Sequence, residues 1–434
     1  MSFRVNGWKE VQLGDVCTLI TDGSHTSPPS VEKGYYMASV KDMDKYEFNL
    51  ENCRMISESD FRILVKNGCK PQYGDVLIGK DGARYLEDVL LFKQTEDIVL
   101  LSSIAILRPD MEKILPRFLY YFLNNKTTKN YIKSNYGSGS AIPRMVLKDF
   151  KRVLIFLPPL QEQIGIEKIL ASLDDKIELN NRMNKVLEQM AQAIFKQWFV
   201  DFEFPNENGE PYKSSGGEME WCEDFGKDIP IFWKYGKLEE LCEITSSKRI
   251  FMSDYKVEGI PFYRSKEIIE KFKGNTISTE LFISEEKFNE IDKKHGSPSQ
   301  GDILLTSVGT LGVPYLVSIE KFYFKDGNLT WFRNFKEKYY SQFIYNWLLY
   351  GDGENQIDNI TIGSTQKAIT IQGLKNVNII TPPHNVLEKY ELLISTLSLK
   401  CSTNISSNAC LSNLRDTLLP KLMSGEIDVS QVEL

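Results

Sequence analysis

The feature that most constrains the fold of this chain is an internal repeat. Leu13-Gly-Asp-Val-Cys17 returns as Leu238-Glu-Glu-Leu-Cys242, and Gly74-Asp-Val-Leu returns as Gly301-Asp-Ile-Leu. The spacing of about 225 residues is far too long for a solenoid, whose repeats are about 20–50 residues long. In a chain of 434 residues, such a repeat predicts two similar domains, each large enough to bury its own core.

Each half of the repeat predicts a mixed domain followed by one long helix. The mixed domains alternate short β-branched and aromatic runs with Gly and Pro, which is typical of strands and turns. We therefore predict an α+β fold. Its expected parts are a first mixed domain at 1–157, a helical spacer at 158–205, a second mixed domain at 206–380 and a second helical spacer at 381–434.

Each predicted helix follows a Pro-Pro pair and carries an apolar stripe. Its apolar residues recur at steps of three and four, which places them along one helix face. One Asn lies inside each stripe at the same register, Asn180 in the first and Asn404 in the second. An Asn at a packing position costs stability but specifies pairing, because its amide needs a partner. This favours an antiparallel coiled-coil spacer with pseudo-twofold symmetry over separate packing of each helix on its own domain.

The sequence also predicts where the second helix ends and which residues of the two stripes make contacts. Pro420 is expected to end or kink the second helix near Leu419, because proline lacks an N–H and crowds the preceding turn. The residues assigned to helix pairing or partner docking are Ile166, Leu170, Leu173, Ile177, Asn180, Leu187, Met190, Ile194, Trp198, Tyr390, Ile394, Leu397, Asn404, Leu411, Leu414 and Leu418.

Composition limits the partners and the compartment. The net charge is −7, yet residues 1–157 and 230–380 hold 41 of the 52 Lys and Arg residues, so a DNA-binding face on the mixed domains is allowed. The sequence has no run of about 18 apolar residues and no apolar core of a signal peptide. Its seven cysteines form no C-x-x-C pair. We therefore expect a cytoplasmic protein with reduced thiols and no membrane partner.

Motifs that would carry catalysis are incomplete. The segment from Gly74 to Lys80 fits the G-x-x-x-x-G-K pattern of a nucleotide-binding loop, but Asp81 replaces the Ser or Thr that would hold magnesium. The repeated copy, which ends at Ser307, has no Lys. The three histidines have no neighbouring Cys or Asp pattern of a triad or a zinc site. We predict no catalytic residue, no metal ligand and no cofactor in this chain, and a degenerate nucleotide hydrolase is the weaker alternative.

Basic and polar side chains beside glycine-rich turns are the best candidates for function. Such side chains can neutralise phosphates, and Arg, Lys, Gln and Asn can also hydrogen-bond to base edges. A solvated loop would have the same composition, so the pattern alone leaves both interpretations open. The candidate DNA-binding residues are Lys41, Lys80, Arg84, Ser140, Arg144, Lys148, Lys248, Arg249, Arg264, Lys266, Ser307, Ser364, Thr365, Gln366 and Lys367.

Several of these segments resemble the specificity subunit of type I restriction-modification systems. Leu157-Pro-Pro-Leu-Gln-Glu-Gln163 and Ala193-Ile-Phe-Lys-Gln-Trp-Phe199 look like its central helix. Gly259-Ile-Pro-Phe-Tyr-Arg264 and Gly363-Ser-Thr-Gln-Lys-Ala-Ile369 look like its recognition segments, and Leu418-Leu-Pro-Lys-Leu-Met-Ser-Gly-Glu426 looks like its usual ending. The resemblance covers essentially the whole chain, although the first domain lacks the Pro and Arg of the 259–264 segment.

The resemblance implies a division of labour among subunits. Each mixed domain would be a target-recognition domain that reads one half of a bipartite site on double-stranded DNA. Two methyltransferase subunits would dock on the helices, and restriction subunits that translocate DNA would join that complex. S-adenosylmethionine, ATP and Mg2+ would bind to those partners, and this chain would contribute sequence specificity without catalysis. The alternative from another class is a protein–protein scaffold with two repeated binding domains.

Overall fold

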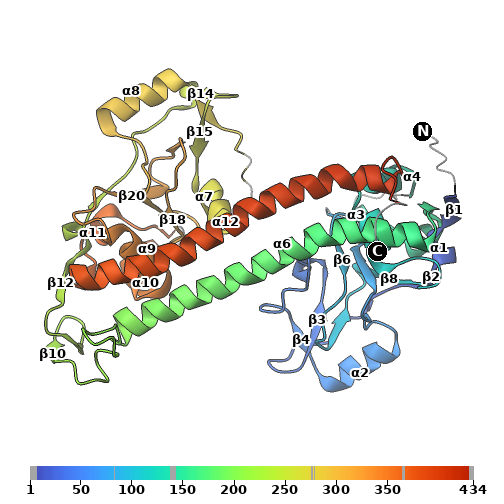
Figure 1. The fold of residues 1–434 in the computed structure, drawn as a ribbon, viewed down its shortest axis with the longest axis horizontal. Coiled ribbons are helices and arrows are strands. Elements are labelled where there is room, and N and C mark those ends of the chain that lie inside the picture. The colour runs from blue at the N-terminus through green and yellow to red at the C-terminus, as the bar shows by residue number, and fades with distance from the viewer. Residues whose placement is uncertain are drawn as a thin grey trace. The chain divides into compact units, whose positions relative to one another are not determined.

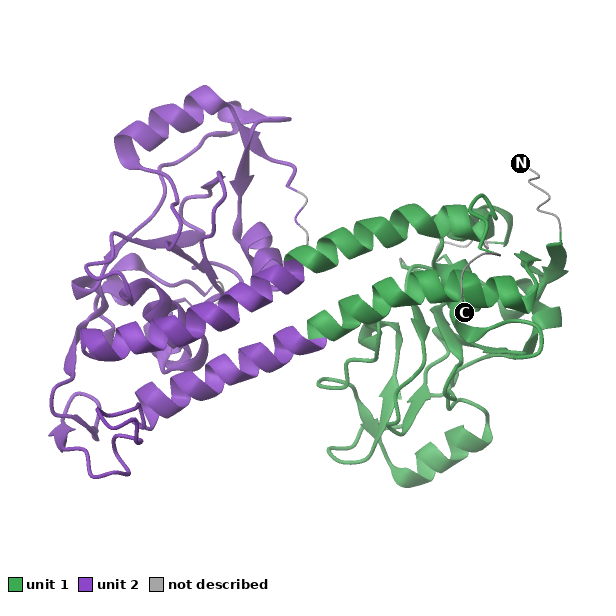
Figure 2. Cartoon of the chain, in the orientation of Figure 1, with its two compact units in different colours: residues 1–181, 406–434 green, residues 182–405 purple. Residues whose placement is uncertain are grey.

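The computed structural model describes residues 7–82, 84–136, 143–274, 277, 279–363 and 367–429. The chain divides into two compact units (Figure 2). Unit 1 comprises residues 1–181 and 406–434, and unit 2 comprises residues 182–405. Each unit therefore contains one mixed domain together with parts of both long helices.

The mixed domain of unit 1 is built on two sheets and a two-stranded ribbon (Figure 1). The first sheet has the strand order β2-β8-β5-β6 with antiparallel pairs, the second has the order β4-β3-β7 with β3 and β7 parallel, and β1 pairs with β9. The strands are β1 Lys9–Gln12, β2 Cys17–Asp22, β3 Tyr35–Ala38, β4 Met55–Ile56, β5 Val76–Gly79, β6 Val89–Leu91, β7 Ile98–Leu100, β8 Ile104–Pro109 and β9 Leu154–Leu157. The helices are α1 Leu13–Val16, the 3-10 helix η1 Val40–Asp42, α2 Glu58–Lys66, α3 Pro116–Asn124, α4 Lys126–Tyr136 and α5 Leu147–Arg152.

The structure argues against a nucleotide-binding loop at 74–80, the weaker alternative of the sequence analysis. Strand β5, Val76–Gly79, lies in the middle of the sheet and is buried at every position. A phosphate-binding loop needs free backbone N–H groups between a strand and a helix, whereas the backbone of β5 is paired with β6 and β8. The apolar run Val-Leu-Ile explains this, because strands buried on both faces read as continuous apolar runs.

The mixed domain of unit 2 repeats this topology. Its sheets have the orders β13-β20-β17-β18 and β14-β16-β15-β19, and β12 pairs with β21 in the place of β1 and β9. The strands are β10 Met219–Cys222, β11 Lys227–Pro230, β12 Lys234–Lys237, β13 Glu243–Thr245, β14 Tyr255–Lys256, β15 Ile260–Tyr263, β16 Phe282–Ile283, β17 Ile303–Thr306, β18 Pro314–Leu316, β19 Tyr323–Phe324, β20 Leu329–Arg333 and β21 Asn378–Thr381. The helices are η3 Leu238–Glu240, η4 Met252–Asp254, α7 Ser265–Phe272, α8 Glu285–His295, α9 Tyr340–Tyr350, α10 Gly353–Ile360 and α11 Ile371–Lys375.

The serine caps and the packing of two corresponding helices also repeat between the two domains. Helix α2 begins after Ser57 and α8 begins after Ser284, and each hydroxyl accepts a hydrogen bond of 3.2 Å from the backbone three residues later. Serine is a favoured residue at this position because it satisfies an otherwise unpaired N–H. Each helix then packs an apolar face on one sheet of its unit, through Phe61 in α2 on the sheet of β3 and through Phe288 in α8 on the sheet of β15. The predicted internal repeat is thus present in the fold.

The two long helices are α6, Leu160–Phe195, and α12, His384–Met423. A short π-helix, Lys196–Val200, continues α6. Each helix starts directly after a Pro-Pro pair, where the missing proline N–H costs nothing. Helix α12 contains Pro420 and ends at Met423, so of the two expected effects of Pro420 the end near Leu419 was wrong, and a kink there stays a prediction. Burial of Leu419 and Leu422 in the core of unit 1 stabilises this last turn. None of the described helices is long and apolar enough to cross a membrane.

Side chains of the two helices contact each other within each unit. In unit 1, Arg415 Nη1 lies 2.7 Å from Asp174 Oδ1, and Asn180 donates to Asn408 Oδ1 at 2.8 Å. In these contacts a higher residue number in α6 meets a lower residue number in α12. The two helices therefore run antiparallel to each other. In unit 2, Asn404 donates to Asn184 Oδ1 at 2.7 Å. Asn180 and Asn404 are both buried, and each has the amide partner that a buried Asn needs.

The predicted stripe residues divide by depth. Those at the ends of the stripe enter the domain cores, as Ile166 and Leu170 do in unit 1 and Tyr390 and Ile394 do in unit 2. The fully buried members are Ile166, Leu170, Ile177, Asn180, Trp198, Tyr390, Ile394 and Asn404. The half-buried members are Leu173, Leu187, Ile194, Leu397, Leu411 and Leu418. Met190 and Leu414 are 46% and 47% exposed. Assignment of individual residues to helix pairing or to partner docking stays a prediction.

The cysteines are free thiols. Four of them are buried, two are half-buried and Cys410 is exposed. Burial raises the pKa of Cys17 and of Cys242 to about 12, so both remain protonated at neutral pH.

Candidate nucleic-acid interface

Loops that are far apart in the sequence meet at one edge of unit 2, which we call loop edge 2. It comprises residues 246–249, 263–266, 307–309, 325–328 and 367–369. The first four loops follow β13, β15 and β17 or precede β20, and the strand pairings bring those ends together. Residues 367–369 precede α11 and reach the edge through a bridge between Val308 and Ala368. Backbone hydrogen bonds join them: Lys325 N to Tyr263 O at 2.8 Å, Ser307 N to Asn328 O at 2.9 Å and Ile369 N to Ser307 O at 2.9 Å.

Unit 1 has the same arrangement, which we call loop edge 1. It comprises residues 22–26, 39–41, 80–82, 101–103 and 143–145. The corresponding hydrogen bonds are Leu101 N to Ala38 O, Lys80 N to Ser103 O and Met145 N to Lys80 O, each at 2.9 Å. The fold therefore gathers Lys41, Lys80 and Arg144 at loop edge 1, and at loop edge 2 it gathers every candidate of the second domain that the structure describes.

Loop edge 2 carries an excess of cations. Lys248, Arg249, Lys266 and Lys367 are exposed there. The Arg249 guanidinium lies 4.0 Å from the carboxylate of Asp326 and over the ring of Phe251, 5.7 Å from its centroid. The remaining cations have no such partner among the described residues. A cationic edge built from exposed loops is suited to neutralising phosphates.

Arg264 is held more tightly than its neighbours. Its Nε and Nη2 donate to the Glu267 carboxylate at 3.2 and 2.6 Å, and its backbone N donates to the same group at 2.8 Å. The hydrogen bonds raise the pKa of Arg264. The pKa of the Glu267 carboxyl is lowered, because bonds from Arg264 outweigh the opposing effect of burial. Sequence analysis missed Glu267, although a Glu three residues after a helix-capping position is a recognisable capping pattern.

Two predicted residues lie beneath the loop edges. Lys80 is 8% exposed, and its ammonium lies 3.3 Å from Asp22 and 3.1 Å from Asp81. Ser307 is 3% exposed, and its hydroxyl pairs with Thr330 at 2.6 Å. Both side chains support the loops from inside, and whether either contacts DNA stays a prediction.

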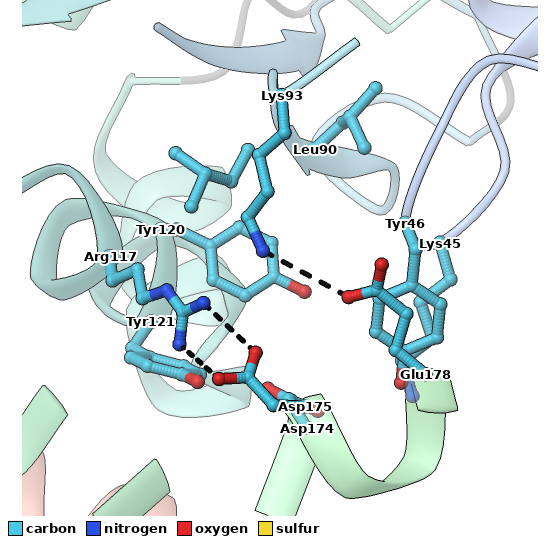
Figure 3. A pocket seen from close by; sticks show the side chains of 11 residues that line it. Lys45, Tyr46, Leu90, Lys93, Arg117, Tyr120, Tyr121, Asp174, Asp175 and Glu178 are labelled. Carbon is cyan, nitrogen blue, oxygen red and sulfur yellow. Dashed lines mark hydrogen bonds and ion pairs between the residues drawn. The ribbon is translucent and has the colours of Figure 1, made fainter. Parts of the chain in front are cut away.

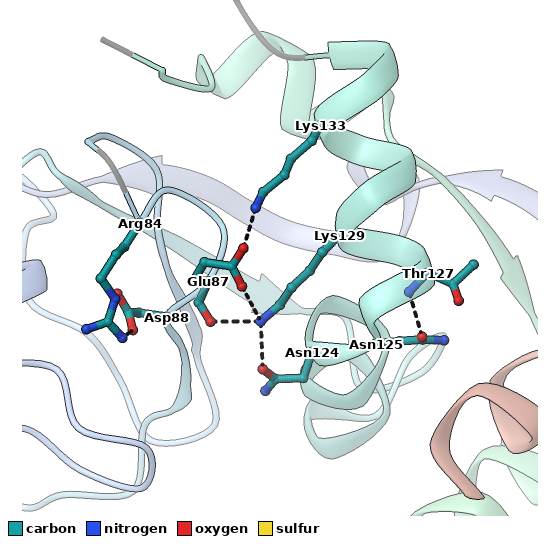
Figure 4. A network of polar contacts seen from close by, with 8 residues as sticks. All are labelled: Arg84, Glu87, Asp88, Asn124, Asn125, Thr127, Lys129 and Lys133. Carbon is teal, nitrogen blue, oxygen red and sulfur yellow. Dashed lines mark hydrogen bonds and ion pairs between the residues drawn. The ribbon is translucent and has the colours of Figure 1, made fainter. Parts of the chain in front are cut away.

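The other predicted residues of the first domain are solvent-facing. Lys41, Arg144 and Lys148 are exposed. Arg84 pairs with Asp88, beside a network in which Lys129 and Lys133 both contact Glu87 (Figure 4). The hydrogen bond from Lys133 lowers the pKa of Glu87. The positive charges of Arg84, Lys129 and Lys133 are therefore partly neutralised by Glu87 and Asp88. Ser140, Ser364, Thr365 and Gln366 lie outside the described residues.

A pocket in unit 1 is lined by charged groups that pair with one another (Figure 3). Arg117 donates to both oxygens of Asp175 at 3.0 and 2.9 Å, and Lys93 lies 3.9 Å from Glu178. Both carboxylates belong to α6, and both cations belong to the mixed domain. These ion pairs therefore connect the mixed domain of unit 1 to α6. The described residues contain no group of three or more His, Cys, Asp or Glu side chains that could hold a metal ion.

Comparisons with known proteins match this architecture. The family model of the type I restriction modification DNA specificity domain matches residues 6–189 and again residues 230–389. The chain is 30% identical over 324 residues to the type I restriction enzyme MjaIX specificity subunit of Methanocaldococcus jannaschii, covering 74% of this chain and 71% of that one. It is 23% identical to the HindI specificity subunit of Haemophilus influenzae, covering 98% and 100%. The crystal structure of a type I S subunit from M. genitalium matches with a TM-score of 0.57 at 16% identity, covering 97% of this chain and 98% of that one, which shows a shared fold.

Proposed function

Because the chain belongs to the family of type I restriction-modification specificity subunits, we propose that each of its two recognition domains reads one half of a bipartite DNA target. As a specificity subunit it is a non-catalytic component of the type I complex that supplies DNA sequence specificity.

The repeated loop edge is the observation that carries the proposal. The same three backbone hydrogen bonds connect four corresponding loops in each unit. Two copies of one surface, each with its own side chains, can read two different short sequences. Lys41 and Arg144 are exposed at loop edge 1, whereas Lys248, Arg249, Lys266 and Lys367 are exposed at loop edge 2. Because the exposed side chains differ, we expect the two half-sites to differ.

The long helices would form the antiparallel coiled-coil spacer between the recognition domains, with pseudo-twofold symmetry. The 36 residues of α6 correspond to about 54 Å of helix at about 1.5 Å per residue. Half-sites one DNA turn apart, about 34–36 Å, present the same groove face. A spacer of this length would let the domains reach half-sites separated by a gap that neither reads. The buried Asn180 and Asn404, with their amide partners, would specify the pairing.

The partners would be two methyltransferase subunits docked on the helices and restriction subunits that translocate DNA. In this proposal the methyltransferase subunits bind S-adenosylmethionine and modify adenine, and the restriction subunits bind ATP and Mg2+. A base inside a duplex must be flipped out before it is methylated, and that step would occur in the partner. Large apolar side chains that remain exposed on the helices, such as Leu392 at 74% and Leu399 at 70%, support docking there.

The experiment that tests this function is co-expression with the methyltransferase encoded beside it, followed by genome-wide mapping of methylated bases. We expect a bipartite motif with a modified adenine in each half. A complex that forms but methylates no specific sequence would contradict the proposal and would favour the scaffold alternative.

Partner docking can be tested on α12. Replacing both Leu392 and Leu399 with Asp is expected to weaken binding of the methyltransferase subunits about 10-fold or more, because two carboxylates would have to lose their water in an apolar contact. Thermal stability of the isolated chain should change little, since both side chains are exposed. Ser395→Asp with Ser402→Asp adds the same charges at the same spacing on the same helix and should have little effect. Equal binding by both double variants in a pull-down titration would remove the two leucines from the docking surface.

A further inference from the structure

The contact between Arg264 and Glu267 leaves one side of the guanidinium free. Glu267 is 2% exposed, whereas the Arg264 side chain is 38% exposed. The carboxylate takes the Nε–H and one N–H of Nη2, which form the side-on face of the guanidinium. A guanidinium has five N–H donors. Three donors remain on Nη1 and Nη2, and two of them form the end-on fork. Within the described residues none of the three makes a hydrogen bond.

The carboxylate restricts the side chain of Arg264. Arg has several rotatable bonds, and fixing them costs conformational entropy. The paired bonds at 3.2 and 2.6 Å hold the plane of the guanidinium in one orientation before any ligand arrives. The backbone bond at 2.8 Å also ties Glu267 to the start of α7, so the carboxylate itself is anchored. The charge of Arg264 is largely balanced by its buried partner, which reduces its value as a contact to phosphate alone.

The equivalent position of the first domain provides a natural comparison. There, Asp42 accepts hydrogen bonds from Ser39 N and Ser39 Oγ, each at 2.8 Å. Asp42 therefore caps the short helix after β3 as Glu267 caps α7 after β15. Ser39 has no guanidinium to orient. The capping role is shared by both domains, and only the second adds a fixed fork of donors at its loop edge.

We infer that Arg264 reads a guanine in the half-site of the second domain, and that Glu267 is its positioning residue. This inference rests on the proposed function. The end-on fork of an Arg matches O6 and N7 of guanine in the major groove, where two parallel hydrogen bonds distinguish G from the other bases. A fixed, nearly charge-balanced fork is suited to base recognition, because a phosphate contact needs charge and no particular orientation.

The test uses the full chain assembled with its methyltransferase subunits. The wild-type motif is first obtained by methylation mapping, and binding is then measured by competition with DNA that carries every single-base change. Arg264→Lys keeps the charge but cannot make the fork, so it should lose preference for G at one base pair of one half-site by about 10- to 100-fold. Glu267→Gln should lose about 3- to 10-fold at the same base pair, because the guanidinium remains but samples more rotamers.

Two controls separate positioning from capping. Asp42→Asn weakens the equivalent cap of the first domain and should leave base preference unchanged in both half-sites. Glu267→Gln added to Arg264→Lys should cause no further loss of preference, since Glu267 acts through Arg264. Additive losses from the two changes would contradict a positioning role.

The outcomes separate this inference from the proposed function. If Arg264→Lys leaves every base preference unchanged while the wild type selects a motif, the inference is wrong and the function stands. If Arg264→Lys weakens binding to all sequences equally, Arg264 contacts phosphate and the inference is also wrong. A wild-type complex that selects no sequence would overturn both.

Discussion

Replacing Asp174 with Ala is expected to lower the free energy of unfolding by about 2–4 kcal/mol, because it leaves the mostly buried cation of Arg415 without its buried carboxylate partner. The two side chains are only 10% and 12% exposed and lie 2.7 Å apart. Asp416, which is 63% exposed, still contacts Arg415 and keeps the destabilisation below that of a fully unpaired charge. Urea unfolding of the full chain, followed by circular dichroism, measures the change.

A second variant tests the reason for this destabilisation. Replacing Asp174 and Arg415 together with Leu removes both charges, and the expected cost is about 1 kcal/mol or less. Asp416→Ala should also cost less than about 1 kcal/mol, because exposed ion pairs contribute little. If the single Asp174→Ala variant and the double Leu variant are equally destabilised, the cost arises from packing and not from an unpaired charge.

The largest functional effect is expected from loop edge 2. Replacing Lys248, Arg249 and Lys367 with Ala in the assembled complex should weaken binding to all DNA sequences by about 10- to 1,000-fold at low salt, since each cation that neutralises a phosphate releases counterions on binding. The slope of log affinity against log salt should become shallower by about 1 for each phosphate that the variant no longer neutralises. Fluorescence anisotropy over a series of salt concentrations measures both quantities.

A matched control tests whether the loss of net charge alone explains the weaker binding to DNA. Lys213, Lys234 and Lys336 are exposed lysines of unit 2 outside loop edge 2. Their triple replacement with Ala removes the same net charge and should leave the salt slope unchanged. Equal weakening by both triple variants would mean that the overall field of the domain, and not this edge, attracts DNA.

The burial and pairing of Asn180 and Asn404 could be predicted from the sequence. The position of Asn180 and Asn404 inside two apolar stripes predicted buried amides that need partners, and both are buried and paired with Asn side chains. The pattern could not identify those partners, Asn408 and Asn184, because on their own helices they read as ordinary polar residues. Register between two helices depends on contacts that no single helix specifies.

The burial of Lys80 and Ser307 could not be predicted from the sequence. Both stand beside glycine-rich turns, and both were predicted to bind DNA from that pattern. The structure buries both side chains, because Asp22 and Thr330 come from strands that the pairing of the sheet brings alongside. Each side chain thus has a partner far away in the sequence, Asp22 or Thr330, that a local pattern cannot identify.

The sequence by itself determined that the chain has two similar mixed domains, two long amphipathic helices and cationic loops, because repeats, periodicity and turn residues are local patterns. It also predicted the family, since the quoted motifs are short and contiguous. Only the tertiary structure decided that five loops of each domain meet at one edge, and that Glu267 orients Arg264 while Asp42 orients no cation. These features depend on strand order and on a few buried hydrogen bonds, which join residues that local patterns cannot connect.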